Sequence, residues 1–223
     1  MMRNEFDFNS GIGESVVKHP QLVKLYMEYD VDFCCGGDRS VDDALKTDCG
    51  ESAREVREKI KYMLTQSETE GDKRLDTLTN EALIDRIVET HHAYLKSELP
   101  VISSLLFKLL GVHGETHPEL YLVHETFGAL KVELESHLIK EEVKLFPRIL
   151  SEDSEVKTLI DELEGEHDAA GDALHRLTEI TNHFTLPQDA CTTYALVYEK
   201  LKTLVADMYM HVHSENNILF KRL

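Results

Sequence analysis

The segment HLIKE at residues 137–141 has a counterpart, HVHSE, at residues 211–215. In both segments a histidine and a glutamate stand four residues apart, so the two side chains project from the same side of a helix. Apolar residues continue that side in both directions, at spacings of three and four. They are Leu130, Leu134 and Leu145 around the first pair, and Leu204, Met208 and Ile218 around the second. The sequence therefore predicts two long helices, each with an imidazole and a carboxylate in the middle of its apolar side.

Two further helices are predicted in the same half of the chain, each with a central histidine on its apolar side. One carries Leu163, His167, Ala170 and Leu174, and the other carries Ile84, Val88, His91 or His92, Leu95 and Leu99. Gly, Pro, Ser and Asn residues mark the breaks, which gives predicted helices at 80–110, 118–150, 155–182 and 187–221. Pro100 should kink or split the first of them. Short connections between four amphipathic helices favour an all-α, antiparallel four-helix bundle.

Metal ligation best explains why these polar side chains occupy core positions. A buried carboxylate without a partner costs several kcal/mol, and two bound cations would turn each imidazole and carboxylate into a ligand. A lone core histidine is more often simply hydrogen-bonded, and a single His-Glu pair can be a surface ion pair. The repeated pair together with central histidines on the other two helices favours a two-metal site. Imidazole and carboxylate ligands accept both iron and manganese.

Composition excludes several classes of partner. The 223 residues are 42 % hydrophobic and carry a formal net charge of −18, which argues against phosphate backbones and anionic membrane surfaces. No stretch approaches the roughly 20 apolar residues of a membrane span, and the first ten residues do not resemble a secretion signal. Four irregularly spaced cysteines do not form a disulfide framework. We therefore expect a cytoplasmic protein with no nucleic-acid or membrane partner. Its oligomeric state stays open, with a homodimer as one alternative.

The N-terminal part of the chain differs in character from the bundle. Residues 1–64 form short segments broken by Gly and Pro, residues 65–78 read as a polar linker, and residues 79–223 form the bundle. Within the first part, Cys34 and Cys35 stand between Asp32 and the glycines Gly36 and Gly37. Buried cysteines are common as small hydrophobic residues, but a vicinal pair beside flexible backbone also suits thiol exchange or the presentation of thiolates to iron.

Several segments together resemble a known family. They are His137 to Pro147, Glu166-His167-Asp168 with the following Ala-Ala-Gly171, Ala190-Cys191-Thr-Thr, His211 to Phe220, and Asp32 to Gly37. In this order they are similar to the hemerythrin-like di-iron proteins for repair of iron–sulfur clusters, the RIC family of ScdA and YtfE type. The resemblance covers almost the whole chain, and it implies a hemerythrin-like bundle preceded by a small helical domain.

The resemblance also implies a set of site residues. The metal ligands would be His92, His137, Glu141, His167, His211 and Glu215. Spacing alone does not choose between His91 and His92, whereas the resemblance selects His92. Both glutamates would bridge two iron ions, together with an oxo or hydroxo group. Glu133 and Glu166 would be acids near the centre, and Cys34 and Cys35 would be redox or transfer thiols. His213 lies on another side of its helix from His211, and we expect it not to be a ligand.

The function implied by the resemblance is repair of iron–sulfur clusters damaged by nitric oxide or oxidative stress, by donation of iron. Damaged iron–sulfur proteins would be the partners, and the protein would be a repair protein and iron donor more than a turnover enzyme. Two alternatives remain. One is a reductase for nitric oxide or oxygen species at the di-iron site, and the other is a hemerythrin-like carrier or sensor of a diatomic ligand.

Overall fold

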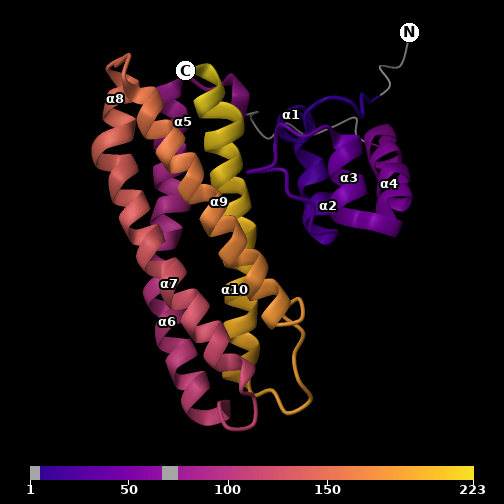
Figure 1. The fold of residues 1–223 in the computed structure, drawn as a ribbon, viewed down its shortest axis with the longest axis vertical. Coiled ribbons are helices and arrows are strands. Elements are labelled where there is room, and N and C mark those ends of the chain that lie inside the picture. The colour runs from indigo at the N-terminus through magenta and orange to yellow at the C-terminus, as the bar shows by residue number, and fades with distance from the viewer. Residues whose placement is uncertain (1–5, 67–74) are drawn as a thin grey trace. The chain divides into compact units, whose positions relative to one another are not determined.

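A computed structural model describes residues 6–66 and 75–223. Within these ranges all the regular elements are helices, which confirms the all-α prediction (Figure 1). The chain divides into two compact units, Met1–Thr79 with Tyr209–Leu223, and Asn80–Met208. In the described part of the chain no helix is both long enough and apolar enough to cross a membrane.

The unit Asn80–Met208 contains the bundle helices seen in Figure 1. The first is α5 (Asn80–Ile87), η4 (Val88–His92) and α6 (Ala93–His113), and the second is α7 (Glu119–Lys140), η5 (Glu141–Leu145) and α8 (Phe146–Leu150). The third is α9 (Val156–Ile180), and the fourth is α10 (Thr192–Ser214) as far as Met208. Helix α7 packs against both α6 and α9. Pro100 is exposed and lies within α6, so the first helix is not split there.

The bundle core follows the apolar stripes of the sequence. Its buried residues include Leu95, Leu99 and Leu106 of α6, Leu130 and Leu134 of α7, Leu163 and Leu174 of α9, and Leu201 and Leu204 of α10. Along each helix the buried residues recur at spacings that keep them on one side of the helix. Burial of that side stabilises the four helices against one another. The polar side chains in the middle of these apolar sides are consequently held inside the protein.

The other unit contains short helices. They are α1 (Ile12–Lys18), η1 (Pro20–Leu22), α2 (Val23–Glu28), α3 (Val41–Cys49), η2 (Gly50–Ser52), α4 (Ala53–Gln66), η3 (Leu75–Thr77), η6 (Glu215–Leu219) and η7 (Phe220–Arg222). Ile12, Leu22, Tyr26, Phe33 and Val56 are buried in this unit. The Ser40 side chain accepts a hydrogen bond from the backbone N–H of Asp43 and so caps α3.

The last turns of the chain pack on the segment around Phe33. The Phe33 ring lies 5.9 Å from the ring of Tyr209 and 5.6 Å from that of His213, measured between centroids. The Asn217 amide donates hydrogen bonds to the carbonyl oxygens of Phe33 (3.3 Å) and Cys34 (2.9 Å). A Cβ atom on Gly37 would lie 2.0 Å from Asn217 Oδ1, so this close approach requires glycine. The Cys-Cys-Gly-Gly motif thus contacts the end of the last helix.

Candidate metal centre

The two His-Glu pairs that led the sequence argument are buried. His137 Nε2 lies 3.2 Å from Glu141 Oε1, and His211 Nε2 lies 3.2 Å from Glu215 Oε1. All four side chains are at most a few per cent exposed. The four-residue spacing therefore does what the helical repeat predicts, and it brings an imidazole nitrogen and a carboxylate oxygen together in the protein interior.

The histidines of the other two helices reach the same carboxylate. His92 Nε2 lies 3.3 Å from Glu141 Oε2, and His167 Nε2 lies 4.0 Å from Glu141 Oε1. His167 Nε2 is also 3.0 Å from His137 Nε2. Glu141 is consequently approached by a nitrogen of His92, His137 and His167, from three different helices.

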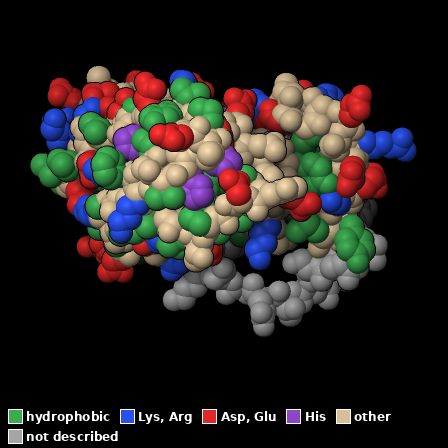
Figure 2. Space-filling view, turned by 90° about the horizontal axis from the view of Figure 1, so that it is seen from below, with side chains coloured by type: hydrophobic (Ala, Val, Ile, Leu, Met, Phe, Trp, Pro, Cys, Tyr) green, Lys and Arg blue, Asp and Glu red, His purple; other side chains and the backbone are tan. Residues whose placement is uncertain are grey.

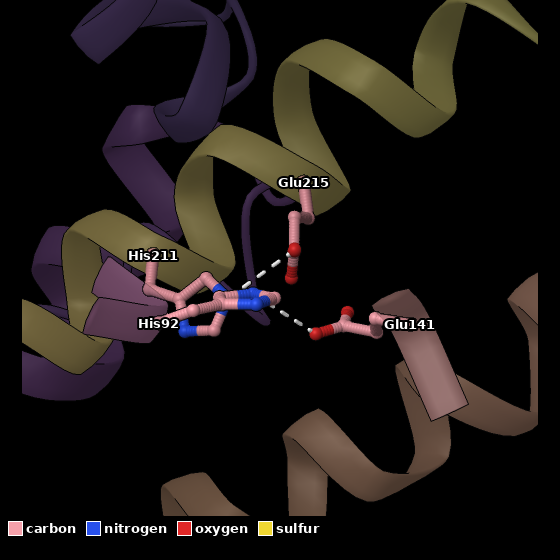
Figure 3. A group of neighbouring side chains, drawn as sticks. All are labelled: His92, Glu141, His211 and Glu215. Carbon is pink, nitrogen blue, oxygen red and sulfur yellow. Dashed lines mark hydrogen bonds and ion pairs between the residues drawn. The ribbon is translucent and has the colours of Figure 1, made fainter. Parts of the chain in front are cut away.

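The six side chains fall into two overlapping groups. One consists of His92, Glu141, His211 and Glu215, and the other of His137, Glu141, His167 and Glu215. Within each group the possible ligand atoms all lie within 4.8 Å of one another. Figure 3 shows the first group, whose imidazole rings and carboxylates point toward one another. Both groups contain the same two glutamates and differ only in their histidines.

Irregular helix geometry occurs where these residues lie. Two π-helical segments, η4 and η5, interrupt bundle helices, and a third, η6, follows α10; each has one of the six residues at its edge. His92 ends η4, Glu141 begins η5, and Glu215 begins η6. A π-helical turn contains an extra residue, which re-aims the side chains around it, and such turns are frequent at functional sites.

Carboxylates also hold the far nitrogens of two of these histidines. Glu142 Oε1 lies 2.7 Å from His92 Nδ1, and Glu166 Oε2 lies 2.8 Å from His137 Nδ1. Burial opposes ionisation of both acids. Hydrogen bonds outweigh that effect and lower the two pKa values, first from Lys96 for Glu142 and from Lys140 for Glu166, and then from the histidines. A carboxylate behind the imidazole is the usual support of a metal-binding histidine.

The donor set fits a cation. Because Nδ1 of His92 and of His137 faces an ionised carboxylate, Nδ1 is the nitrogen that carries the proton in each neutral ring. The Nε2 lone pair of each ring then points at the oxygens of Glu141. This arrangement is electrostatically unfavourable unless positive charge lies between the two atoms. A divalent or trivalent metal ion supplies that charge, and nitrogen with oxygen donors suits iron, manganese or zinc.

The remaining sequence candidates lie around this cluster. His91 is not in either group, and its Nδ1 lies 2.8 Å from Asp207 Oδ1. His213 is buried but is likewise in neither group, and burial lowers its pKa to about 4. Sequence reasoning missed Glu142 and Asp207, because each meets a histidine of another helix and no spacing along the chain signals such a pair.

A surface pocket of about 450 Å³ lies between α7 and α9. Its walls are formed by Val132, Glu133, Leu134, Ser136, His137, Gly165, Glu166, His167, Ala169 and Ala170. The pocket thus reaches two of the buried histidines. Glu166 contacts His137 directly, whereas Glu133 is exposed on the pocket wall. The two predicted acids therefore differ in their distance from the cluster.

The vicinal cysteines belong to the other unit. Cys34 is buried and Cys35 is half-buried, with their sulfur atoms 4.0 Å apart. The Asp32 carboxylate accepts hydrogen bonds from the backbone N–H groups of Cys34, Cys35 and Gly36, which shapes the turn. The hydrogen bond with Cys35, followed by burial, raises the pKa of the Cys34 thiol well above its ordinary value. Cys34 is therefore held as a thiol, and Cys35 is the more accessible sulfur.

Comparison with known proteins gives two domain matches. The hemerythrin HHE cation binding domain matches residues 83–223, and ScdA_N, a domain of unknown function (DUF542), matches residues 8–61. The iron-sulfur cluster repair protein YtfE of Escherichia coli O157:H7 is 33 % identical, over 95 % of this chain and 94 % of its own. The protein of the same name from Yersinia pseudotuberculosis is 32 % identical, over 96 % of both chains. The iron-sulfur cluster repair protein ScdA of Staphylococcus epidermidis is 26 % identical, over 95 % of this chain and 96 % of its own. The chain therefore belongs to the hemerythrin HHE cation-binding family, among the iron–sulfur cluster repair proteins of ScdA and YtfE type.

Proposed function

We propose that this protein repairs iron–sulfur clusters damaged by nitric oxide or oxidative stress, by donating iron held between its buried histidines and glutamates. The observation that carries the proposal is the pair of overlapping ligand groups, which share Glu141 and Glu215. Two groups with two common carboxylates match two metal ions that are bridged by those carboxylates. The names of the relatives support the choice of iron–sulfur clusters as the target.

Each ligand has a definite role in this proposal. His92 and His211 bind one iron ion, and His137 and His167 bind the other. Glu141 and Glu215, which both groups share, would bridge the two ions, with an oxo or hydroxo group between them. Glu142 and Glu166 orient the imidazoles of His92 and His137 from behind, and their negative charge strengthens the nitrogen donors.

Iron is the cargo in this scheme, so it must be able to leave. The attraction between a carboxylate and an ion scales with the charge of the ion, so Fe(II) is held less strongly than Fe(III) by Glu141 and Glu215. The pocket between α7 and α9 gives the cluster a route to the surface, and Glu133 and Glu166 place negative charge along its wall. We propose that these two acids guide the cation between the surface and His137.

Cys34 and Cys35 are proposed to be the redox or transfer thiols of the repair reaction. Cys35 would meet the client, because it is the more accessible of the two. All four cysteines of the chain are free thiols. We further propose that the protein works in the cytoplasm, where thiols stay reduced.

The test is the reactivation of a dehydratase whose iron–sulfur cluster has been damaged by nitric oxide. The iron-loaded protein should restore activity faster than an equal amount of free ferrous iron, and the iron-free protein should not restore it. A variant with both Cys34→Ser and Cys35→Ser should keep its iron but act more slowly. If the loaded protein gives no advantage over free iron and instead consumes nitric oxide catalytically, repair is wrong and the reductase alternative is favoured.

A further inference from the structure

A second cluster of metal-binding side chains lies at one end of the bundle. It involves His113 at the end of α6, His117 in the turn before α7, and Asp189 and Cys191 in the connection between α9 and α10. Figure 2 views the molecule from below, the end of Figure 1 where this turn and connection lie, and shows histidine side chains at the surface beside acidic ones. Helix α6 is 21 residues long and has His92 just before its start, so its length of about 30 Å separates this cluster from the first.

The nitrogen and oxygen atoms of His113, His117 and Asp189 already lie close together, and the sulfur of Cys191 contacts one of these residues, His113. His117 Nε2 lies 3.1 Å from both carboxylate oxygens of Asp189. His113 Nε2 lies 3.3 Å from Cys191 Sγ. The possible ligand atoms of His113, His117 and Asp189 lie within 4.8 Å of one another. Two segments far apart in the sequence thus contribute two potential ligands each.

Both imidazole rings are held by their surroundings. The ring of Tyr194, which is 1 % exposed, meets the His113 and His117 rings edge-on, each with centroids 5.5 Å apart. His117 Nδ1 also lies 3.2 Å from Glu119 Oε1. With a cation bound at Nε2, the ring proton would lie on Nδ1 beside Glu119, which is the arrangement of a metal-binding histidine with its supporting acid.

We propose that His113, His117, Asp189 and Cys191 form a binding site for a single Zn²⁺ ion. Zinc takes four ligands in a tetrahedron, at about 2.0–2.2 Å for nitrogen and oxygen and about 2.3 Å for sulfur. Two ligands of one zinc ion are therefore separated by about 3.3–3.6 Å. The separations of 3.1 Å and 3.3 Å within the two pairs approach these values. Cys191 is exposed, and rotation of its side chain would bring the sulfur from His113 toward the ligand atoms of His117 and Asp189. Two imidazoles, a carboxylate and a thiolate are a set that zinc accepts.

Zinc binding displaces protons from this site. Cys191 gives up its thiol proton on ligation, and His117 gives up a proton whenever its imidazole is charged. The hydrogen bond with Asp189 raises the pKa of His117, so protons compete with zinc for this imidazole more strongly than for a free imidazole. An ion pair between His117 and Asp189 explains that contact alone, whereas a zinc site also explains why Cys191 meets His113. The bound ion would fasten the segment before α10 to the turn between α6 and α7.

Zinc titration of the full-length, iron-loaded protein tests the proposal. Zinc and iron per chain are measured by elemental analysis after unbound metal has been removed. Cobalt(II) then replaces zinc as a spectroscopic probe, because a cobalt–thiolate bond gives a charge-transfer band. The variants are His117→Gln, Asp189→Asn and Cys191→Ser. His183→Asn is the matched control, since His183 lies in the same connection at a positive φ of 55° that asparagine tolerates.

The wild type and His183→Asn should each bind one zinc ion per chain with no loss of iron. His117→Gln and Asp189→Asn should weaken zinc binding at least about tenfold with unchanged iron content, and Cys191→Ser should abolish the charge-transfer band. Uptake of zinc only in exchange for iron would overturn the proposal, as would equal zinc affinity in the wild type, His117→Gln and Asp189→Asn. A wild-type cobalt complex without the band would remove Cys191 from the site.

Discussion

The shared glutamates are the residues on which the buried cluster depends most. Glu141 is fully buried, and its carboxylate is approached by nitrogens of three histidines. Removal of its charge would leave two bound cations poorly compensated, so Glu141→Gln should lose most of the bound iron. Glu135→Gln, an exposed change on the same helix, is the control. Iron measured per chain decides the matter, and full iron content in Glu141→Gln would show that this carboxylate is not a bridge.

Protonation of His213 should couple stability to pH. Burial lowers its pKa from 6.5 to about 4, so the unfolded chain takes up a proton at a higher pH than the folded protein does. The stability contributed by this residue is therefore complete above about pH 6.5 and is lost as the pH falls toward 4. This difference between the pKa values of the unfolded and the folded state corresponds to about 3 kcal/mol in the free energy of unfolding.

Urea unfolding of the wild type and of His213→Gln, at pH 7 and at pH 4.5, measures this effect. Both proteins contain the same buried cluster, so the difference between their pH dependences isolates His213. The wild type should lose more of its free energy of unfolding than the variant on acidification. Parallel losses in the two proteins would mean that His213 is not held in its neutral form.

Spacing along a helix predicted the residues that meet in the cluster, but not those that support it. His137 and Glu141 are one helical turn apart, so a repeat of 3.6 residues is enough to pair them. His92 and Glu142 come from different helices, and their contact depends on how η4 and η5 pack. Spacing alone did not choose between His91 and His92, whereas the family resemblance selected His92. In the structure His91 contacts Asp207 and His92 contacts Glu141, within and at the end of the π-helical segment η4.

At the scale of elements, the bundle helices were predictable and their π-helical segments were not. The apolar residues of the sequence fit a regular α-helix on either side of each π-helical segment. Because apolar residues on one side of a helix are spaced by either three or four positions, one extra residue does not disturb the pattern enough to be recognised. The consequences are local but large, because an added residue turns the following side chains by about 100°. His92, Glu141 and Glu215 all lie at the edges of such segments.

Deletion of Val143 tests whether the π-helical segment η5 positions the cluster. Val143 lies within η5 and is 67 % exposed, so its removal takes little from the core. The deletion should restore a regular α-helix and rotate His137 and Glu141 relative to Leu145 and Phe146. We expect normal helix content by circular dichroism and a sharp loss of bound iron, with Val143→Ala as the control. Retention of iron would show that the extra residue has no role in the site.

At the scale of the whole molecule, composition predicted a small N-terminal part and a bundle. It did not predict that the C-terminal residues belong to the same compact unit as the N-terminal part. The expected bundle spanned residues 79–223, yet Tyr209–Leu223 packs with the N-terminal residues as one compact unit. Contacts such as those of Asn217 with the carbonyl groups of Phe33 and Cys34 cannot be read from periodicity. The domain boundaries at 64 and 79 stay a prediction.

A fragment that begins at Leu75 tests that division. Every proposed iron ligand follows this point, so the fragment should fold as a helical protein and bind iron. Tyr209, His213 and Asn217 lose their contacts with Phe33 and Cys34, so the fragment should melt at a lower temperature and release iron faster than the full chain. Failure to bind iron at all would contradict the proposed ligand set and would implicate the N-terminal residues in the metal site.

Transfer of isotopically labelled iron tests the donor function most directly. The protein is loaded with ⁵⁷Fe, mixed with a dehydratase whose cluster has been damaged by nitric oxide, and kept in a buffer with a chelator that binds free iron. Mössbauer spectroscopy of the repurified dehydratase then reports the origin of the iron in its cluster. We predict a rebuilt cluster that contains ⁵⁷Fe, with a matching loss of iron from the donor. A rebuilt cluster without ⁵⁷Fe, or a donor that keeps all of its label while the cluster stays damaged, would contradict iron donation.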